Sequence, residues 1–146
     1  MAIADRRATT TWQGTLAAGD GKVSGDSGAI NGLAVDWAAR TEEPGGKTSP
    51  EELAAAAHSS CFSMAFALKL AEAGGRPQKL DVSATVTLDE VDGAPTVVSS
   101  ALEVKAQVDG LDADDFDAVV SDAMALCPIG RLFAGAEVTV EAELER

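Results

Sequence analysis

The feature that most constrains this fold is a long helix with no charge along its centre. Residues 53–68 contain no Lys, Arg, Asp or Glu. A Ser-Pro-Glu-Glu motif at residues 49–52 is typical of a helix N-terminus, and Gly74 and Gly75 supply a C-terminal stop. The sequence therefore predicts a helix over residues 50–73, about 36 Å long at about 1.5 Å per residue.

Most of the circumference of this helix is apolar or small, so we expect it to be buried nearly all round. A membrane-spanning helix needs roughly 20 apolar residues, and this run is shorter and interrupted by His58 and by serines. We interpret it as the buried helix of a soluble protein. In a chain of 146 residues such a helix needs a sheet that wraps it or a partner chain that covers it.

The rest of the chain predicts strands on both sides of this helix and a second helix after it. Asp92 and Gly93 indicate a hairpin, and Pro95 indicates a turn longer than two residues. The order of elements predicts an α+β fold, with one domain over residues 1–146 and an antiparallel sheet wrapped around the central helix. Strands are expected at residues 9–16, 22–24, 33–37, 80–91, 96–108 and 138–144, the second helix at 112–126 and a loop at 42–47.

The charge of the chain limits its partners. A formal net charge of -13 argues against binding to nucleic acid or to an anionic membrane, since both need a basic surface. Residues 1–11 have no apolar core and do not resemble a signal peptide, so we expect a cytoplasmic protein. Cysteines in that compartment are more often reactive or simply buried than joined in a structural disulfide.

The chain has two cysteines, and each has surroundings that suit a placed thiol. Cys61 lies in mid-helix, where a buried thiol is inert unless a cation such as His58 or Arg40 comes close. If Pro128 begins a new helical turn, Cys127 is its N-cap, where backbone N–H groups stabilise a thiolate. Burial as an ordinary core cysteine explains each of them equally well.

His58 and the two thiols also bear on metal binding. A hydrogen-bonded buried histidine is a better interpretation of His58 than a catalytic base. Two thiols and one histidine are too few for the four ligands of a structural zinc site, and no Gly-rich stretch fits a nucleotide motif. We therefore predict no metal and no cofactor.

Two motifs, in matching order and spacing, resemble the osmotically inducible protein C (OsmC) family. The first runs from the Thr-Ser-Pro-Glu-Glu-Leu of residues 48–53 into the Ala-Ala-Ala-His-Ser-Ser-Cys-Phe-Ser-Met of residues 55–64. The second is Leu-Cys-Pro-Ile at residues 126–129. The resemblance covers nearly the whole chain. A histidine at residue 58 makes the chain more similar to the OsmC branch, because the organic hydroperoxide resistance branch usually has Tyr at that position.

The resemblance implies a peroxidase that reduces organic hydroperoxides, and hydrogen peroxide less well, with a thiol reductant. By match to the family motifs, Cys61 is the peroxidatic cysteine, Cys127 the resolving cysteine, and Arg40 and Glu51 the pair that stabilises the thiolate. Members of the family are intertwined homodimers with active sites at the subunit interface. Ten helical residues separate Glu51 from Cys61 by about 15 Å, so we expect Glu51 to act from the second subunit.

Apolar side chains near the thiol would favour an alkyl hydroperoxide over hydrogen peroxide, although core packing explains each candidate equally well. A different thiol chemistry, such as disulfide exchange or thioester hydrolysis, lacks a Cys-x-x-Cys pair and a Cys-His-Asp set. A non-enzymatic dimer that binds a small lipophilic ligand and keeps its cysteines inert in the core stays open. The candidate substrate-binding residues are Phe62, Met64, Phe66 and Phe133.

Overall fold

The computed structural model of the chain describes residues 1–145. Over these residues it contains two three-stranded sheets and four helices, which confirms the predicted α+β class. The chain divides into two compact units, Met1–Leu53 and Ala54–Arg146. Each unit positions its own side chains.

The first unit holds an antiparallel sheet in the order β1 (Ala8–Gln13), β2 (Asp20–Gly25) and β3 (Leu33–Val35). The strand expected at residues 33–37 ends early, because a short helix, α1 (Trp37–Thr41), begins there. Asp36 is its N-cap, and the Oδ1 atom accepts a hydrogen bond of 2.7 Å from the backbone N–H of Ala39. A capping carboxylate favours helix over strand at this point.

The long helix, α2 (Pro50–Glu72), begins and ends where the sequence predicts. The Ser49 hydroxyl accepts a hydrogen bond of 3.1 Å from the backbone N–H of Glu52, as an N-cap does. Gly74 has a φ of +85°, the left-handed conformation that closes a helix, and the N–H of Gly75 donates to the carbonyl of Leu70 at 2.8 Å. This pattern is a Schellman motif.

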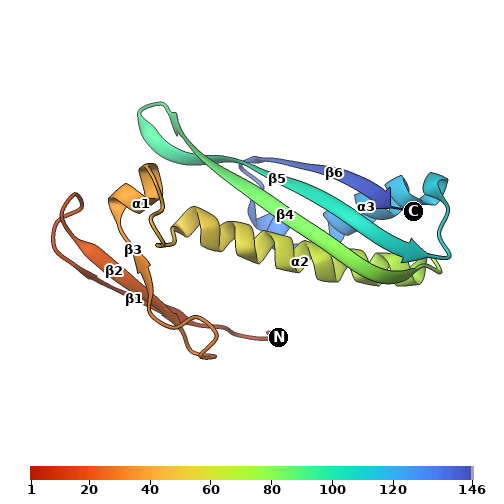
Figure 1. Ribbon diagram of the computed structural model, residues 1–146, viewed down its shortest axis with the longest axis horizontal. Helices are drawn as coiled ribbons and strands as arrows, with labels where there is room; N and C mark the ends of the chain where they lie inside the picture. The colour runs from red at the N-terminus through yellow and green to blue at the C-terminus, as the bar shows by residue number, and fades with distance from the viewer. Residues whose placement is uncertain (146) are drawn as a thin grey trace. The chain divides into compact units, whose positions relative to one another are not determined.

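The second unit holds a sheet in the order β4 (Arg76–Val91), β5 (Ala94–Asp109) and β6 (Glu137–Glu145) (Figure 1). β4 and β5 are antiparallel as predicted, whereas β6 is parallel to β5, so the expectation of an antiparallel sheet is wrong for β6. Two helices lie between β5 and β6 in the chain, α3 (Ala113–Leu126) and α4 (Pro128–Leu132). They form the crossover that a parallel pair needs.

The turn between β4 and β5 is shorter than expected. Val91 pairs with Ala94, so the loop consists of Asp92 and Gly93 alone. Both have positive φ, +51° and +81°, which matches the right-handed twist of the hairpin. Pro95 lies within the strand and pairs with Glu90.

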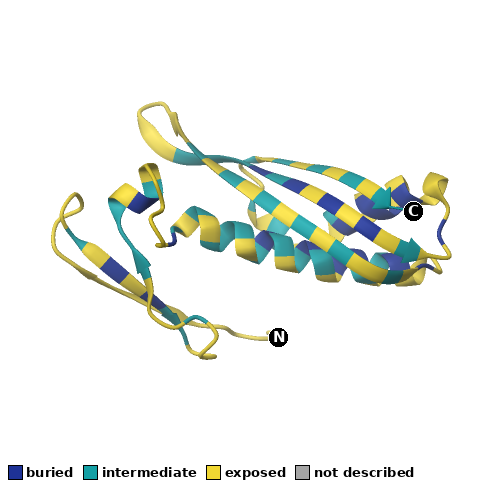
Figure 2. Ribbon diagram, in the orientation of Figure 1, coloured by how far each residue is buried: buried dark blue, intermediate teal, exposed yellow. Residues whose placement is uncertain are grey.

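The core of the second unit lies between one face of α2, the inner face of the sheet and α3 (Figure 2). Buried Leu102, Val104 and Ala106 alternate with exposed residues along β5, and Phe62 and Phe66 of α2 pack in the same cluster. The other members of the cluster are Ala65, Leu70, Leu111, Phe116, Val119, Val120, Ala123 and Cys127.

The predicted all-round burial of α2 is wrong for a single chain. Its opposite face leaves Met64 74% and Leu68 50% exposed. By length and composition alone, α2 could also cross a bilayer. Its packing against a sheet and α3 is that of a core helix, and such helices meet the same criterion.

Candidate functional site

Arg40 and Glu51, two of the four predicted catalytic residues, form a bidentate ion pair within the first unit. Nε of Arg40 donates to Oε1 of Glu51 at 2.9 Å, and Nη2 of Arg40 donates to Oε2 of Glu51 at 3.0 Å. The Glu51 side chain is 12% exposed and that of Arg40 31%. A guanidinium has five N–H donors, so this pair leaves donors of Arg40 free for a further anion.

Local structure around α1 and the start of α2 places this pair. Asp36 caps α1, which carries Arg40, and also pairs with Lys47. The hydrogen bond from Lys47 is the main reason that the pKa of Asp36 lies below its usual value. Thr48 is buried, and its N–H donates to the carbonyl of Ala34 at 2.9 Å, which joins the chain before α2 to β3. Glu51 lies in the first turn of α2, where the helix dipole favours a carboxylate.

Cys61 and Cys127, the other two predicted catalytic residues, come together in the second unit. Both are free thiols, Cys61 half-buried on α2 and Cys127 1% exposed at the junction of α3 and α4. Cys61 packs against the buried cluster that contains Cys127, and its thiol is close enough to raise the pKa of Cys127. Cys127 is the N-cap of α4, as predicted, and Pro128 is the first residue of that helix.

The N-cap position does not make Cys127 an easily ionised thiol, as the sequence suggested it would. The backbone N–H of Gly130 donates to Sγ at 3.4 Å and lowers the pKa of Cys127. Burial has the larger effect, and the neighbouring Cys61 thiol adds to it, so the pKa of Cys127 is raised from its usual value. The thiol is therefore held protonated next to Cys61.

His58 is a buried, hydrogen-bonded histidine, which confirms the interpretation preferred from the sequence. It is 1% exposed, and Nδ1 lies 2.6 Å from the hydroxyl of Ser100 on β5. Burial lowers the pKa of His58, so the imidazole is neutral near pH 7 and does not supply the cation that Cys61 needs. Of the two cations that the sequence offered as candidates, Arg40 remains.

The four predicted substrate-binding residues occupy different surroundings. Phe62 lines a small cavity of about 150 Å³ that His58, Cys127 and Gly130 also line. Phe133 packs on the His58 ring, with centroids 5.1 Å apart. Phe66 packs in the core against Phe116 and Phe62, and Met64 is 74% exposed on the outer face of α2.

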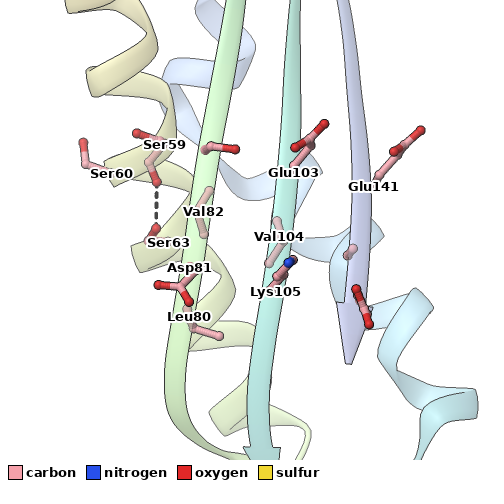
Figure 3. A pocket seen from close by; sticks show the side chains of 13 residues that line it. Ser59, Ser60, Ser63, Leu80, Asp81, Val82, Glu103, Val104, Lys105 and Glu141 are labelled. Carbon is pink, nitrogen blue, oxygen red and sulfur yellow. Dashed lines mark hydrogen bonds between the residues drawn. The ribbon is translucent and has the colours of Figure 1, made fainter. Parts of the chain in front are cut away.

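A larger groove of about 760 Å³ runs along the second unit (Figure 3). Its lining includes Ser59 and Ser63 of α2 and charged side chains of all three strands, among them Asp81, Glu103 and Glu141. Neither cysteine is among the described residues that line it. Its hydroxyls and carboxylates offer no nucleophile comparable to the thiol pair.

The chain belongs to the OsmC family. A family model described as OsmC-like protein matches residues 43–143, which is more than half of the chain and includes Glu51, Cys61 and Cys127. Arg40 lies three residues before the matched range, so its assignment depends on the ion pair with Glu51 rather than on this match.

Named relatives agree with this assignment. The chain is 40% identical over 134 residues to the protein named peroxiredoxin OsmC of Escherichia coli K12, covering 92% of each chain. It is 33% identical over 116 residues to organic hydroperoxide resistance protein-like 1 of Staphylococcus epidermidis, covering 79% of this chain and 80% of the relative. An OsmC-like protein of unknown function from Vibrio cholerae shares the fold, with a TM-score of 0.76, 18% identity and coverage of 97% of this chain and 100% of that one.

The sequence did not single out Ser100, Gly130 or the helix that carries Arg40. A signal was present for α1, because Asp36 precedes a Trp-Ala-Ala-Arg run and Asp is a strong N-cap. Ser100 stands in a strand of alternating residues, and only its pairing across the core with His58 distinguishes it.

Proposed function

We propose that this chain is a cysteine-based peroxidase that reduces organic hydroperoxides, and hydrogen peroxide less well, with electrons from a thiol reductant. The observation that carries the proposal is that the chain's two cysteines are neighbours in the second unit, where Cys61 packs against the cluster that holds Cys127, in a member of the OsmC family. The peroxiredoxin and organic hydroperoxide resistance names of the relatives support the same class of reaction. We place the activity in the cytoplasm, where thiols are kept reduced between turnovers.

The reaction starts at Cys61. Its thiolate attacks the terminal oxygen of the hydroperoxide; the O–O bond breaks, and the alkoxide leaves and takes up a proton to become an alcohol. Cys61 is then a sulfenic acid. The positive charge of Arg40, held by Glu51, stabilises the thiolate before the attack and the negative charge on the leaving oxygen during it.

The protonated Cys127 thiol completes the oxidative half of the cycle. Its sulfur attacks Cys61, an S–S bond forms, the S–O bond breaks, and the hydroxyl leaves with the thiol proton as water. A dithiol or a low-molecular-weight thiol then supplies two electrons and two protons to reduce the disulfide.

We further propose that two chains form an intertwined homodimer in which both units of each chain act as one peroxidase domain. The exposed apolar face of α2 supports a partner chain, because a soluble monomer would leave Met64 and Leu68 in water. Glu51 and Cys61 are ten residues apart on one helix, about 15 Å, which a side chain does not span. The Arg40–Glu51 pair therefore serves Cys61 of the second subunit.

The first test treats reduced protein with a small excess of cumene hydroperoxide and follows intact mass and free thiols. The expected result is rapid loss of two thiols and of two hydrogens in mass, with no disulfide in Cys61→Ser. In Cys127→Ser we expect a sulfenic acid that oxidises further. Thiols that stay free in the wild type after prolonged exposure would refute the peroxidase and favour a dimer that binds a lipophilic ligand.

Complementation tests the shared site. Cys61→Ser chains, expected to be inactive, and Arg40→Met chains, expected to be strongly impaired, are mixed under conditions that exchange subunits. If Arg40 acts on the partner's thiol, each mixed dimer regains one complete site, and activity returns. If mixing restores nothing although mixed dimers form, the pair acts within its own chain.

A further inference from the structure

His58 is a buried polar residue that the proposed reaction does not use, and its contacts tie together the elements that carry the two thiols. It lies on α2, three residues before Cys61, so the two side chains share one side of the helix. Its Nδ1 lies 2.6 Å from the hydroxyl of Ser100, which is 0% exposed, on the central strand β5. This bond fixes the plane of the ring.

The rest of the ring faces the segment that carries the resolving thiol. Phe133, the C-cap of α4, packs on the ring with centroids 5.1 Å apart. In the middle of α4, a Cβ added to Gly130 would come 3.3 Å from Nε2 of His58 and 3.6 Å from Sγ of Cys127. A methyl group at residue 130 would therefore press on Nε2 of His58 and make ordinary van der Waals contact with Sγ of Cys127, so the glycine lies between the ring and the thiol.

Gly130 connects the ring to the thiol. Its N–H donates to Sγ of Cys127 at 3.4 Å, and it is the residue that Nε2 approaches. α4 has only five residues, too few to hold its own position, so its place depends on what it packs against. Along its length it meets His58 at Gly130 and again at Phe133.

We infer that His58 is a positioning residue for the resolving thiol: fixed by Ser100, its ring holds α4 so that Cys127 meets Cys61. The inference rests on the proposed function and adds to it a residue for the disulfide-forming step. That step needs the two sulfurs to approach in a narrow geometry, and displacement of a reacting group by about 1 Å can cost about 100-fold in rate.

The test separates the two chemical steps in stopped-flow experiments with the reduced full-length protein and cumene hydroperoxide. Dimedone trapping and intact mass report the sulfenic acid, and loss of the second thiol reports the disulfide. His58→Phe keeps a ring but loses the Ser100 bond, whereas His58→Asn keeps a hydrogen-bonding group near Nδ1 but loses the ring against Gly130. We expect disulfide formation to slow at least about tenfold more than sulfenic acid formation in both variants.

Ser100→Ala provides a second measurement if the His58 variants fold poorly, since it leaves the ring in place. We expect a smaller slowing of the same step, together with a larger fraction of overoxidised Cys61 after repeated peroxide addition. Ser99→Ala is the matched control, because the neighbouring residue of a strand points to the other face of the sheet, and it should match the wild type.

The outcomes separate this inference from the proposed function. If the wild type forms the disulfide and folded His58 and Ser100 variants form it at the same relative rate, the positioning role is refuted and the peroxidase stands. If both steps slow equally, the residues only maintain the fold, and the inference is again refuted. If the wild type forms no sulfenic acid, the proposed function itself has failed.

Discussion

Replacing Glu51 by Gln tests whether the carboxylate acts through Arg40. The substitution keeps size and one acceptor oxygen but removes the charge from both hydrogen bonds. A hydrogen bond to a charged group contributes about 1.5–3 kcal/mol, and the 31% exposure of Arg40 screens part of this. We therefore take about 1.5–3 kcal/mol as the total contribution of the two hydrogen bonds between Arg40 and Glu51. If that free energy is lost from the transition state, kcat/KM falls about 10- to 150-fold.

A double-mutant cycle sharpens the test. If Glu51 acts only by holding the guanidinium, the peroxide reaction of Arg40→Met and that of the double variant with Glu51→Gln should have the same rate within about twofold. The rate is the second-order loss of thiol with cumene hydroperoxide, and thermal unfolding checks that each variant is folded. Glu43→Gln, at an exposed glutamate of the same unit, controls for loss of one negative charge. A wild-type rate in Glu51→Gln, or effects that multiply in the double variant, would refute the reasoning.

Three further predictions concern stability and are measured by urea denaturation. Phe66→Ala removes a side chain that is 0% exposed and packs on Phe62 and Phe116, so the free energy of unfolding should fall by about 3–5 kcal/mol; a loss below about 1 kcal/mol would contradict the assigned core. Asp36→Ala removes the N-cap of α1 and should cost about 1 kcal/mol, an effect that high salt should not abolish if capping rather than the Lys47 pair is responsible. Because burial lowers the pKa of His58 from 6.5, the unfolded chain binds a proton that the folded chain refuses, so stability should fall as the pH drops below about 6.5; an unchanged pH profile in His58→Phe would assign that loss to other groups.

The sequence predicted an element well where several local signals agreed. The cap at Ser49, the uncharged centre and Gly74 determined both ends of α2. The direction of β6 did not follow, because alternation along a strand is the same in parallel and antiparallel pairs, and only the crossover through α3 and α4 decides it. The predicted end of the strand at residues 33–37 was wrong because the N-cap at Asp36 starts α1 and outweighs the short apolar–polar alternation.

For the site, the motifs named the candidate residues but did not show how deeply each is buried or what it bonds to. The position of Cys127 before Pro128 predicted the N-cap, and the structure confirmed it. The same position predicted a stabilised thiolate, which was wrong because the sequence does not show how deeply the thiol is buried. His58 was ambiguous for the same reason, until its contact with Ser100 on a distant strand showed what the ring is bonded to.

The burial of Cys127 gives the proposed reaction its order. A peroxide reacts with a thiolate and not with a thiol, so a cysteine whose pKa is raised by burial is protected from direct attack. In the proposed reaction, Cys127 would therefore stay reduced until Cys61 has become a sulfenic acid, whose electrophilic sulfur accepts a weaker nucleophile at short range. Two easily ionised thiols side by side would instead compete for the peroxide, and some chains would be oxidised first at the cysteine that has to resolve. Burial of Cys127 would thus lower its reactivity toward peroxide and reserve it for the second step that we propose.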